Sequence, residues 1–506
     1  MSLAIVFTRA QLGVEAPLVT VETHLSNGLP GFTIVGLPET AVRESKDRVR
    51  SALLNSHFEF PQRRITVNLA PADLPKEGGR YDLAIALGIL AASEQIPKEP
   101  LQKYEFIGEL ALSGELRRVN GCIPAGIACS NSERSLVVPR LNMAEAALCR
   151  NTHTLTASNL LSVCAHLHGR NELPEPLKPV PHNAFYDIDL GDVKGQPHAR
   201  RALEIAAAGG HNLLFIGPPG TGKSMLASRL PTIMPALNET EALEVAAIRS
   251  IANNISGADW LSRPYRSPHH TASAVAMVGG GSNPRPGEIS LAHNGILFLD
   301  ELPEFSRQVL EVLREPLETG HICISRANAQ VQYPAQFQLV AALNPCPCGY
   351  FNDGTDRCRC TPQQVSRYRN KISGPLLDRI DMHVHVGAIP LRELQEKPDG
   401  ETSAVVRQRV VVSRERQLQR QQKCNAQLRN KELVKFCKLG EYEKELLATS
   451  LVRLNLSARA YDRVLRVALT IADLAGCEKI EMPHISEALG YRSLDRAPSS
   501  NTLTPA

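Results

Sequence analysis

The pattern of apolar residues predicts strands and helices that alternate through much of the chain. Continuous apolar runs at 213–216, 295–299 and 337–343 are typical of strands buried on both faces of a parallel sheet. Before residue 170, strand patterns such as 65–69 mix with a helical stretch that begins at Leu83. Helical patterns dominate the remainder, at 407–427, 435–450, 457–474 and 483–491. The chain is therefore expected to be an α/β protein with a helical C-terminal part.

Proline residues mark a boundary between the first region and the rest. Residues 173–181 contain four prolines, which prevent a helix and favour an extended spacer. A chain of 506 residues is long enough for several cores. We expect a first domain at 1–172, a linker at 173–185, a central domain at 186–392, a helical domain at 393–496 and a disordered tail at 497–506.

Composition narrows the possible partners and locations. The net charge is only +4, so contact with nucleic acid would need a local basic surface. The most basic segment, 414–423, is polar on most faces, which favours a solvated helix over a nucleic-acid contact. No apolar run is long enough for a bilayer, and the apolar N-terminal stretch is too short for a signal peptide. We expect no membrane association and a cytoplasmic location, where the twelve cysteines would be mostly reduced.

A glycine-rich loop between an apolar strand and a helical run carries the clearest chemistry. It matches the pattern G-x-x-x-x-G-K-S in full, as Gly217, Pro218, Pro219, Gly220, Thr221, Gly222, Lys223 and Ser224. Its glycines let backbone amides converge on phosphates, and the helix N-terminus favours an anion. Lys223 is expected to reach the β- and γ-phosphates of ATP, and Ser224 to hold Mg²⁺.

Polar residues end the two later apolar strands. Asp300 and Glu301 follow the strand at 295–299, and Asn344 follows the strand at 337–343. Phosphoryl transfer needs a carboxylate near the metal and a group that orients water. We therefore expect Asp300 beside Mg²⁺, Glu301 as the base that polarises water, and Asn344 near the γ-phosphate. An ordinary strand-end cap and an Asn-Pro turn are the alternatives.

Four cysteines form a compact cluster at 346–360. Two C-x-C pairs, Cys346 with Cys348 and Cys358 with Cys360, flank nine residues that include turn formers. Four thiolates suit tetrahedral zinc, although the tight spacing departs from the usual C-x₂-C. We expect a structural zinc knuckle, with free thiols as the alternative. The adjacent His269 and His270 would point in different directions, which favours a structured loop over a metal site.

The chain resembles the YifB/ComM family of magnesium-chelatase-like AAA+ ATPases over nearly its whole length. The resemblance rests on five segments, which are GLPGFTIVGLPE at 28–39, NLAPADLPKEG at 68–78, DVKGQ at 192–196, RSPHHT at 266–271 and SGPLLDRID at 373–381. It implies an AAA+ P-loop αβα core, a C-terminal helical lid and an N-terminal Lon-protease-like α+β domain of the ribosomal S5 domain 2 type, as in ChlI. The Lon serine position falls in 75–82, which has no serine, and the Lon lysine position falls near 123–125, which has no lysine, so no protease activity is expected.

The resemblance also implies roles that no residue pattern shows by itself. Proteins of this kind assemble as rings, typically hexamers, with ATP between subunits. Arg379 would be the arginine finger, Arg459 the sensor-2 arginine of the lid, and Gln196 part of the segment near adenine. Arg285, in an insert at 271–288, and Arg326, at a hairpin tip, would be the DNA contacts.

Taken with the resemblance, the ATP-site motifs point to a hexameric ATP-dependent DNA motor. The specific expectation is a branch-migration helicase that promotes integration of incoming DNA in natural transformation and homologous recombination. The alternative is a protein-remodelling or assembly ATPase of the magnesium-chelatase type, which would share every ATP residue. A clear aromatic pore loop would favour that alternative, and the sequence does not show one.

Overall fold

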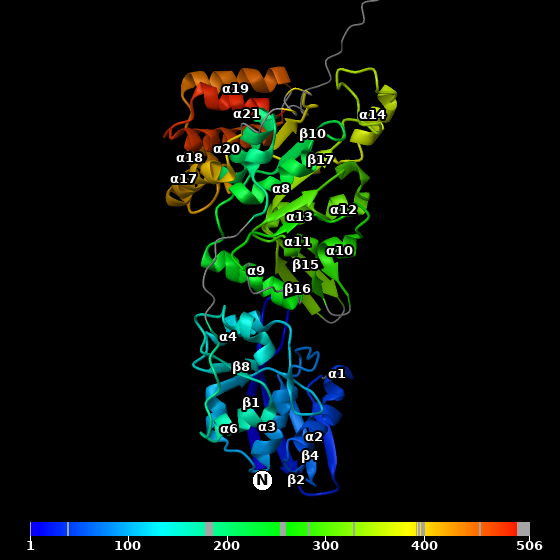
Figure 1. Cartoon of the computed structure of the whole chain (residues 1–506), viewed down its shortest axis with the longest axis vertical. Coiled ribbons are helices and arrows are strands. Elements are labelled where there is room, and N and C mark those ends of the chain that lie inside the picture. Colours follow the sequence, from blue (N-terminus) through cyan, green and yellow to red (C-terminus); the bar gives the residue numbers. More distant parts are fainter. Residues whose placement is uncertain are drawn as a thin grey trace, which may run out of the picture.

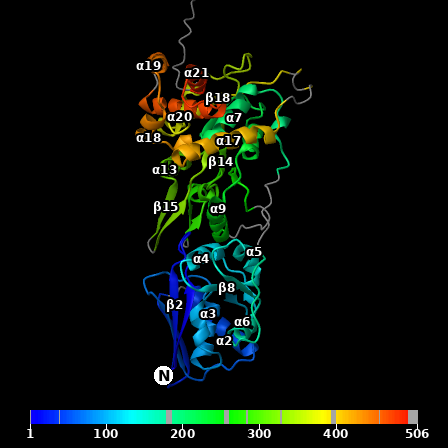
Figure 2. The same cartoon turned by 90° about the vertical axis from the view of Figure 1, so that its left-hand side faces the viewer.

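Apolar strands build two large sheets in the computed structural model, one in each half of the molecule. The structure describes residues 2–37, 40–177, 186–252, 260–281, 284–326, 329–390, 392, 395, 400–454 and 457–492. Three units follow one another along the long axis, with the N-terminal unit at one end and the C-terminal helices at the other (Figures 1 and 2). Most of the expected linker, 178–185, and the expected tail, 497–506, lie outside the described residues.

The N-terminal unit is a mixed sheet covered by helices. Its seven described strands lie in the order β3-β4-β2-β1-β5-β8-β9. Their bounds are β1 Ser2–Arg9, β2 Leu18–Ser26, β3 Gly31–Val35, β4 Arg64–Ala70, β5 Tyr104–Phe106, β8 Ser135–Pro139 and β9 Thr154–Ala157. Burial alternates along β2 because one face of the sheet packs inward. The helix expected from Leu83 is α3 (Asp82–Ala92), which is buried along its whole length.

Smaller elements complete this unit. The helices are α1 Thr40–Arg43, α2 Ser45–Asn55, α4 Cys122–Cys129, α5 Met143–Ala146 and α6 Leu160–Leu167, and β6 Glu109–Leu110 pairs with β7 Leu116–Arg117. Helix α2 packs on α3, which in turn packs on β1 and β2.

The central unit is a parallel sheet in the order β11-β14-β17-β10-β18. Its strands are β10 Leu213–Ile216, β11 Tyr265–Arg266, β14 Ile296–Leu299, β17 Gln338–Leu343 and β18 Met382–His385. The three strands expected from apolar runs are β10, β14 and β17, and all three are completely buried. Alternate side chains enter separate cores on the two faces, as Leu213 and Leu214 do. The predicted α/β class and αβα core are confirmed.

Helices cover both faces of this sheet, and two hairpins extend from it. The helices are α7 Pro197–Gly209, α8 Lys223–Ile233, α9 Glu239–Ile251, α10 Ala274–Val278, α11 Glu288–Leu291, α12 Arg307–Val312, α13 Arg314–Thr319, α14 Pro362–Arg369 and α15 Gly374–Leu377. The hairpins are β12 Gly279–Gly280 with β13 Arg285–Pro286, and β15 His321–Arg326 with β16 Ala329–Pro334.

The C-terminal unit is helical, as the sequence predicts. Its helices are α17 Ser403–Gln421, α18 Asn430–Phe436, α19 Glu441–Leu454, α20 Ala458–Ala475 and α21 Met482–Gly490. Helix α17 ends earlier than expected because Gln422 adopts a left-handed conformation. None of the described helices combines the length and the apolarity that crossing a bilayer requires.

The segment 414–423, expected to be a solvated helix, is exposed along one face, at Glu415, Arg416 and Gln419, and packed along the other. Helix α17 packs between α7 and α20, and Gln417 is completely buried. Arg420 makes a two-pronged ion pair with Asp473 of α20, at 2.7 and 2.8 Å. Arg414 donates to the carbonyl of Ala207 on α7. Arg420 therefore ties α17 to α20 within the C-terminal unit, and Arg414 ties α17 to the central unit.

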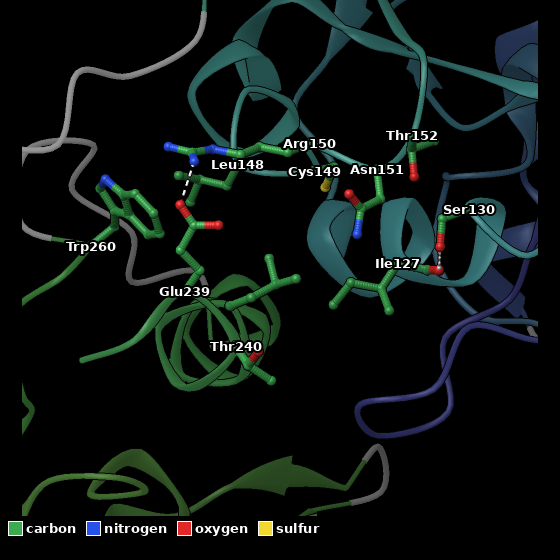
Figure 3. A pocket seen from close by; sticks show the side chains of 11 residues that line it. Ile127, Ser130, Leu148, Cys149, Arg150, Asn151, Thr152, Glu239, Thr240 and Trp260 are labelled. Carbon is green, nitrogen blue, oxygen red and sulfur yellow. Dashed lines mark hydrogen bonds and ion pairs between the residues drawn. The ribbon is translucent and has the colours of Figure 1, made fainter. Parts of the chain in front are cut away.

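Helices α4 and α9 join the N-terminal unit to the central unit. Ile123, Leu148 and Cys149 share an apolar cluster with α9 side chains and Trp260. A pocket of about 280 Å³ lies at the edge of this cluster (Figure 3). Across it, Arg150 pairs with Glu239 at 2.5 Å and lies 5.6 Å from the centre of the Trp260 ring.

Buried polar groups also connect α4 and its neighbours to α9, and we call this whole contact between the N-terminal and central units the joint. The hydroxyl of Ser250, at the end of α9, donates to the carboxylate of Glu145. Arg118 donates to the same carboxylate at 2.8 Å, and the Gly121 amide donates to the Ser250 carbonyl at 3.2 Å. Glu145 and Ser250 are buried, so their contact is shielded from water, whereas Arg118 reaches them from a half-buried position.

We predict that Glu145→Ala weakens the joint, because it leaves the Arg118 guanidinium and the Ser250 hydroxyl without their acceptor. The expected loss is about 2–3 kcal/mol in the free energy of unfolding, the range for hydrogen bonds to charged groups. Glu239→Ala is the matched control, because its carboxylate is 71% exposed and its pair with Arg150 is worth less than about 1 kcal/mol. Urea unfolding followed by Trp260 fluorescence measures both, and equal losses would contradict the prediction.

Candidate functional site

The glycine-rich loop joins the C-terminal end of β10 to α8. Gly220 and Gly222 have φ of +77° and +86°, which side chains other than glycine rarely adopt. A Cβ on Gly217 would lie 2.1 Å from the carbonyl oxygen of Val386, so only glycine fits there. Gly222 precedes α8 and provides no side-chain cap. The first amides of α8 are therefore open to an anion.

Lys223 lies folded over this loop. Its Nζ donates to the carbonyls of Gly217 and Pro218, at 2.7 and 2.8 Å, and to Oδ1 of Asn344 at 3.1 Å. Burial lowers the pKa of Lys223, and the nearby carboxylates of Asp300 and Glu301 oppose that shift. The ammonium group is thus held between the loop and the end of β17, where it can meet a phosphate.

Ser224 and Asp300 bring two oxygen donors together. The Ser224 hydroxyl donates to Oδ2 of Asp300 at 2.5 Å, across the gap between α8 and β14. The other carboxylate oxygen of Asp300 accepts the Glu301 amide at 2.9 Å. Hydroxyl and carboxylate oxygens are the ligands that Mg²⁺ prefers. The pair therefore fits a magnesium ion beside a bound nucleotide.

The remaining residue expected at this edge is Gln196. It begins α7, and its side-chain amide donates to the Gly387 carbonyl at 2.6 Å, just beyond the C-terminal end of β18. Because β18 lies beside β10, Gln196 lies near the glycine-rich loop. Its role near adenine stays a prediction.

Arg379 and Arg459 lie at the opposite edge of the sheet. The Asn212 side chain, before β10, donates to the Arg379 carbonyl at 2.9 Å, so Arg379 lies beside the start of that strand. The glycine-rich loop follows the other end of β10, four residues and roughly 13 Å away. Arg459 pairs with Asp378 at 3.5 Å, and Arg379 pairs with Glu318. The structure therefore does not bring either arginine to the glycine-rich loop of its own chain.

The four cysteines of 346–360 converge. The Cys346 and Cys358 sulfurs are 3.8 Å apart, and those of Cys348 and Cys358 are 3.7 Å apart. All four sulfurs lie within 4.8 Å of one another. Tetrahedral zinc with bonds of about 2.3 Å requires sulfurs about 3.8 Å apart, so the set fits zinc. Backbone hydrogen bonds at Tyr350 and Arg359 lower the pKa of Cys348, whereas burial and the neighbouring thiols leave the pKa values of Cys358 and Cys360 raised.

This cysteine cluster touches the nucleotide loop. Gly349, between the cysteines, has φ of +89°, and a Cβ there would lie 2.6 Å from Cδ of Pro219. Asn344, which accepts from Lys223, lies only two residues before Cys346. A change in the fold of the cluster would therefore affect both Pro219 in the loop and Asn344 beside Lys223.

The two arginines expected to contact DNA lie on the two hairpins. Arg285 is exposed on β13, where it pairs with Gly280. The backbone of Arg326 pairs with Ala329 at the end of β15. The turn between them, 327–328, lies outside the described residues.

One residue of the site was missed by the sequence reasoning. The histidine pair was interpreted as a structured loop, but Nδ1 of His270 lies 3.5 Å from Oε2 of Glu301. The apolar pattern gave no signal for this position, because the strand before the loop, β11, is only two residues long.

A parallel sheet with a phosphate loop after a central strand, and with carboxylate and amide groups at the ends of two neighbouring strands, defines the class of P-loop AAA+ proteins. Three family models match this chain. "Magnesium chelatase, subunit ChlI" covers 189–394, "Subunit ChlI of Mg-chelatase" covers 21–142, and "Magnesium chelatase, subunit ChlI C-terminal" covers 400–492.

Relatives match almost end to end. Competence protein ComM of Haemophilus influenzae is 55% identical, over 98% of each chain. The uncharacterized protein YifB of Escherichia coli is 53% identical, also over 98% of each chain. An uncharacterized protein of Mycobacterium tuberculosis is 41% identical over 97% of this chain and 99% of its own. The chain belongs to the YifB/ComM family of magnesium-chelatase-like AAA+ proteins, whose cofactors are ATP and Mg²⁺.

We predict that metal loss from the cysteine cluster weakens ATP binding, because the Gly349 turn would no longer support Pro219. Protein purified without chelator should hold about one zinc per chain. Cys358→Ser should lose the metal and lower ATP affinity roughly tenfold, equivalent to about 1.4 kcal/mol. Cys323→Ser, which removes a partly buried thiol on β15, is the control. Full ATP affinity in a metal-free Cys358→Ser protein would contradict the prediction.

Proposed function

We propose that this chain is a subunit of a hexameric, ATP-driven motor that acts on branched DNA. The observation that supports hydrolysis is the meeting of Lys223, Ser224, Asp300 and Asn344 at one sheet edge, through hydrogen bonds of 2.5–3.1 Å. Such a cluster has a phosphate cradle, a charge for the phosphates and oxygen ligands for a metal. Glu301, whose carboxylate lies near Lys223, adds the base that a binding scaffold without turnover would not need.

Binding begins at the glycine-rich loop. The free amides of α8 receive the phosphates, and Lys223 moves its donors from the carbonyls of Gly217 and Pro218 to the phosphate oxygens. Gln196 supports the base at the other end of the nucleotide. Mg²⁺, held by Ser224 and Asp300, supplies charge neutralisation when bound.

Hydrolysis then depends on Glu301 and Asn344. Glu301 accepts a proton from the attacking water. At the same time the water oxygen bonds to the γ-phosphorus, and the bond between the γ-phosphorus and the ADP oxygen breaks. Asn344 keeps Lys223 in place and faces the same edge. Glu301 has φ of +52°, a left-handed conformation that is uncommon and strained for a residue with a side chain. Strain of this kind is typical of functional sites.

In a ring, the neighbouring subunit would supply the arginines that the nucleotide site of one subunit lacks. Arg459 pairs with Asp378, the residue directly before Arg379, so the two arginines lie near each other. Both lie at the ends of the strands opposite the phosphate loop. In a head-to-tail ring, one edge of each subunit faces the opposite edge of its neighbour. We infer that both arginines act on the neighbour's nucleotide. There they would stabilise the charge that develops on the phosphates during transfer.

DNA is the substrate that fits the relatives best. The Haemophilus relative is named a competence protein, which supports a role in natural transformation and homologous recombination. We infer that the two hairpins carry Arg285 and Arg326 toward DNA in the pore of the ring. The N-terminal unit is not a protease on this account. Its loop near the Lon serine position holds a buried Lys76 that donates to the Pro71 carbonyl, and no serine.

We predict that four-way and forked DNA stimulate ATP hydrolysis several-fold over linear duplex, and that the protein moves a four-way junction only with ATP. DNA binding should weaken as salt rises, because arginine–phosphate contacts release counterions. Glu301→Gln should still bind ATP but lose turnover by at least about a hundredfold, and should leave junctions unmoved. Hydrolysis that ignores every DNA, but responds to a protein substrate, would support the remodelling alternative and overturn the DNA motor.

A further inference from the structure

The turn between β1 and β2 reaches from the N-terminal unit to the central unit, and we call residues 10–17 the β1–β2 turn (Figures 1 and 2). Its backbone closes tightly, because Leu12 and Glu15 exchange amide-to-carbonyl hydrogen bonds of 3.0 Å in both directions. Gly13, between them, has φ of +60°, which residues with a side chain rarely adopt. The turn therefore has a well-defined backbone conformation.

Buried arginines of the N-terminal unit hold this turn. Arg9 donates to the Ala16 carbonyl at 3.0 Å and forms an ion pair with Glu105 at 2.6 Å. Arg80 donates to Oε1 of Gln11 at 3.2 Å. Because both guanidinium groups are buried, these contacts are shielded from water. The turn is therefore fixed to the N-terminal unit.

The other side of the turn packs against the β15–β16 hairpin of the central unit. A Cβ on Gly13 would lie 2.4 Å from Cγ1 of Val331 and 3.8 Å from Cζ of Tyr333. Leu12 and Val14, on either side of Gly13, pack against the apolar cluster that includes Val331 and Tyr333. Only glycine fits against β16 this closely, so the turn and the hairpin meet in one defined arrangement.

The β15–β16 hairpin needs such a contact to fix its direction. Among the described strands, β15 and β16 pair only with each other and do not join the five-stranded sheet. A two-stranded ribbon alone is only marginally stable in water, so packing against its surroundings has to hold it. That packing buries Ile322, Ile324, Val331 and Tyr333. The β1–β2 turn supplies part of it.

Tyr333 extends this contact to the β12–β13 hairpin. Its ring lies beside Gly13 of the turn, and its hydroxyl donates to the Pro284 carbonyl at 2.7 Å. Pro284 directly precedes Arg285, which is exposed on β13. The two hairpins and the turn therefore form one packed group.

We propose that the β1–β2 turn is a positioning element for DNA contact, which holds both hairpins where their arginines reach DNA. This inference rests on the proposed DNA function, and it gives the N-terminal unit a part in that function. The strand ends of the ATP site are held by the pairing of β10, β14 and β17 instead. A disturbed turn therefore weakens DNA contact and leaves DNA-free ATP hydrolysis unchanged.

Binding of a four-way DNA junction by the full-length protein tests this, together with ATP hydrolysis measured with and without that DNA. Gly13→Ala directs a methyl group into Val331 and should weaken junction binding at least about fivefold, with DNA-free hydrolysis within about twofold of the wild type. Val331→Ala removes the methyl groups that the new side chain would meet. Gly13→Ala combined with Val331→Ala should therefore recover binding to within about threefold of the wild type, and Val331→Ala alone completes the double-mutant cycle.

Gly169→Ala supplies the matched control. Gly169 lies in the N-terminal unit with φ of +70°, and a Cβ there would meet no atom within 4 Å. The variant therefore carries a similar backbone strain without the contact. It should bind the junction as the wild type does.

Tyr333→Phe is a second test, which leaves the turn itself unchanged. It removes only the hydroxyl that donates to the Pro284 carbonyl. Loss of one such hydrogen bond should weaken junction binding about threefold, again without a change in DNA-free hydrolysis.

The outcomes separate this inference from the function on which it rests. Wild-type protein without salt-dependent junction binding would overturn the proposed DNA function, and this inference with it. Wild-type binding together with unchanged binding by Gly13→Ala would overturn the inference alone. So would a double variant that binds no better than Gly13→Ala, or an equal loss of DNA-free hydrolysis, because the damage would then not come from the hairpin contact. If Gly13→Ala fails to fold, Tyr333→Phe decides, and wild-type junction binding by that variant overturns the inference.

Discussion

The parallel pairing of β10 with β17, and of β17 with β14, is the constraint on which the nucleotide site depends. Ile216 lies opposite Leu343, and Leu299 lies opposite Ala341, so the three strands end within a residue or two of one another. The residues that directly follow these strands therefore lie close together, although they are far apart in the sequence. Because both faces of the strands are buried, the register cannot slip without exposing two cores at once.

The same strand pairing places the phosphate loop and Arg379 at opposite ends of the strands. The phosphate loop follows β10 at one edge, whereas Arg379 precedes β18 at the other. Helix α9 adds a mechanical connection to this arrangement. Its Ser250 binds the N-terminal unit, and its Glu244 accepts from Asn294 and pairs with His293 just before β14. Movement of the strand that carries Asp300 can therefore reach the N-terminal unit through one helix.

The sequence was sufficient for the three central strands β10, β14 and β17 and for the glycine-rich loop, because apolar runs and glycine spacing are local signals. It also predicted that Asp300 and Asn344 would share an edge, since the carboxyl ends of parallel strands meet. The His270 contact with Glu301 could not be predicted, because it joins two loops whose side chains are directed by tertiary packing. The contacts on the packed face of α17 could not be predicted for a related reason. Arg420 pairs with Asp473, and Arg414 donates to the Ala207 carbonyl. These partners are about 50 and 200 positions away in the sequence.

We propose that each nucleotide site takes Glu301 from one subunit and Arg379 from the next. Subunit mixing tests it most directly, with Glu301→Gln and Arg379→Ala proteins that are each inactive alone. In rings mixed at equal amounts, about a quarter of the interfaces would join an intact Glu301 to an intact Arg379. The account predicts that mixing restores ATP hydrolysis. If mixed rings form and remain as inactive as either parent, both residues serve the same subunit and the account is wrong.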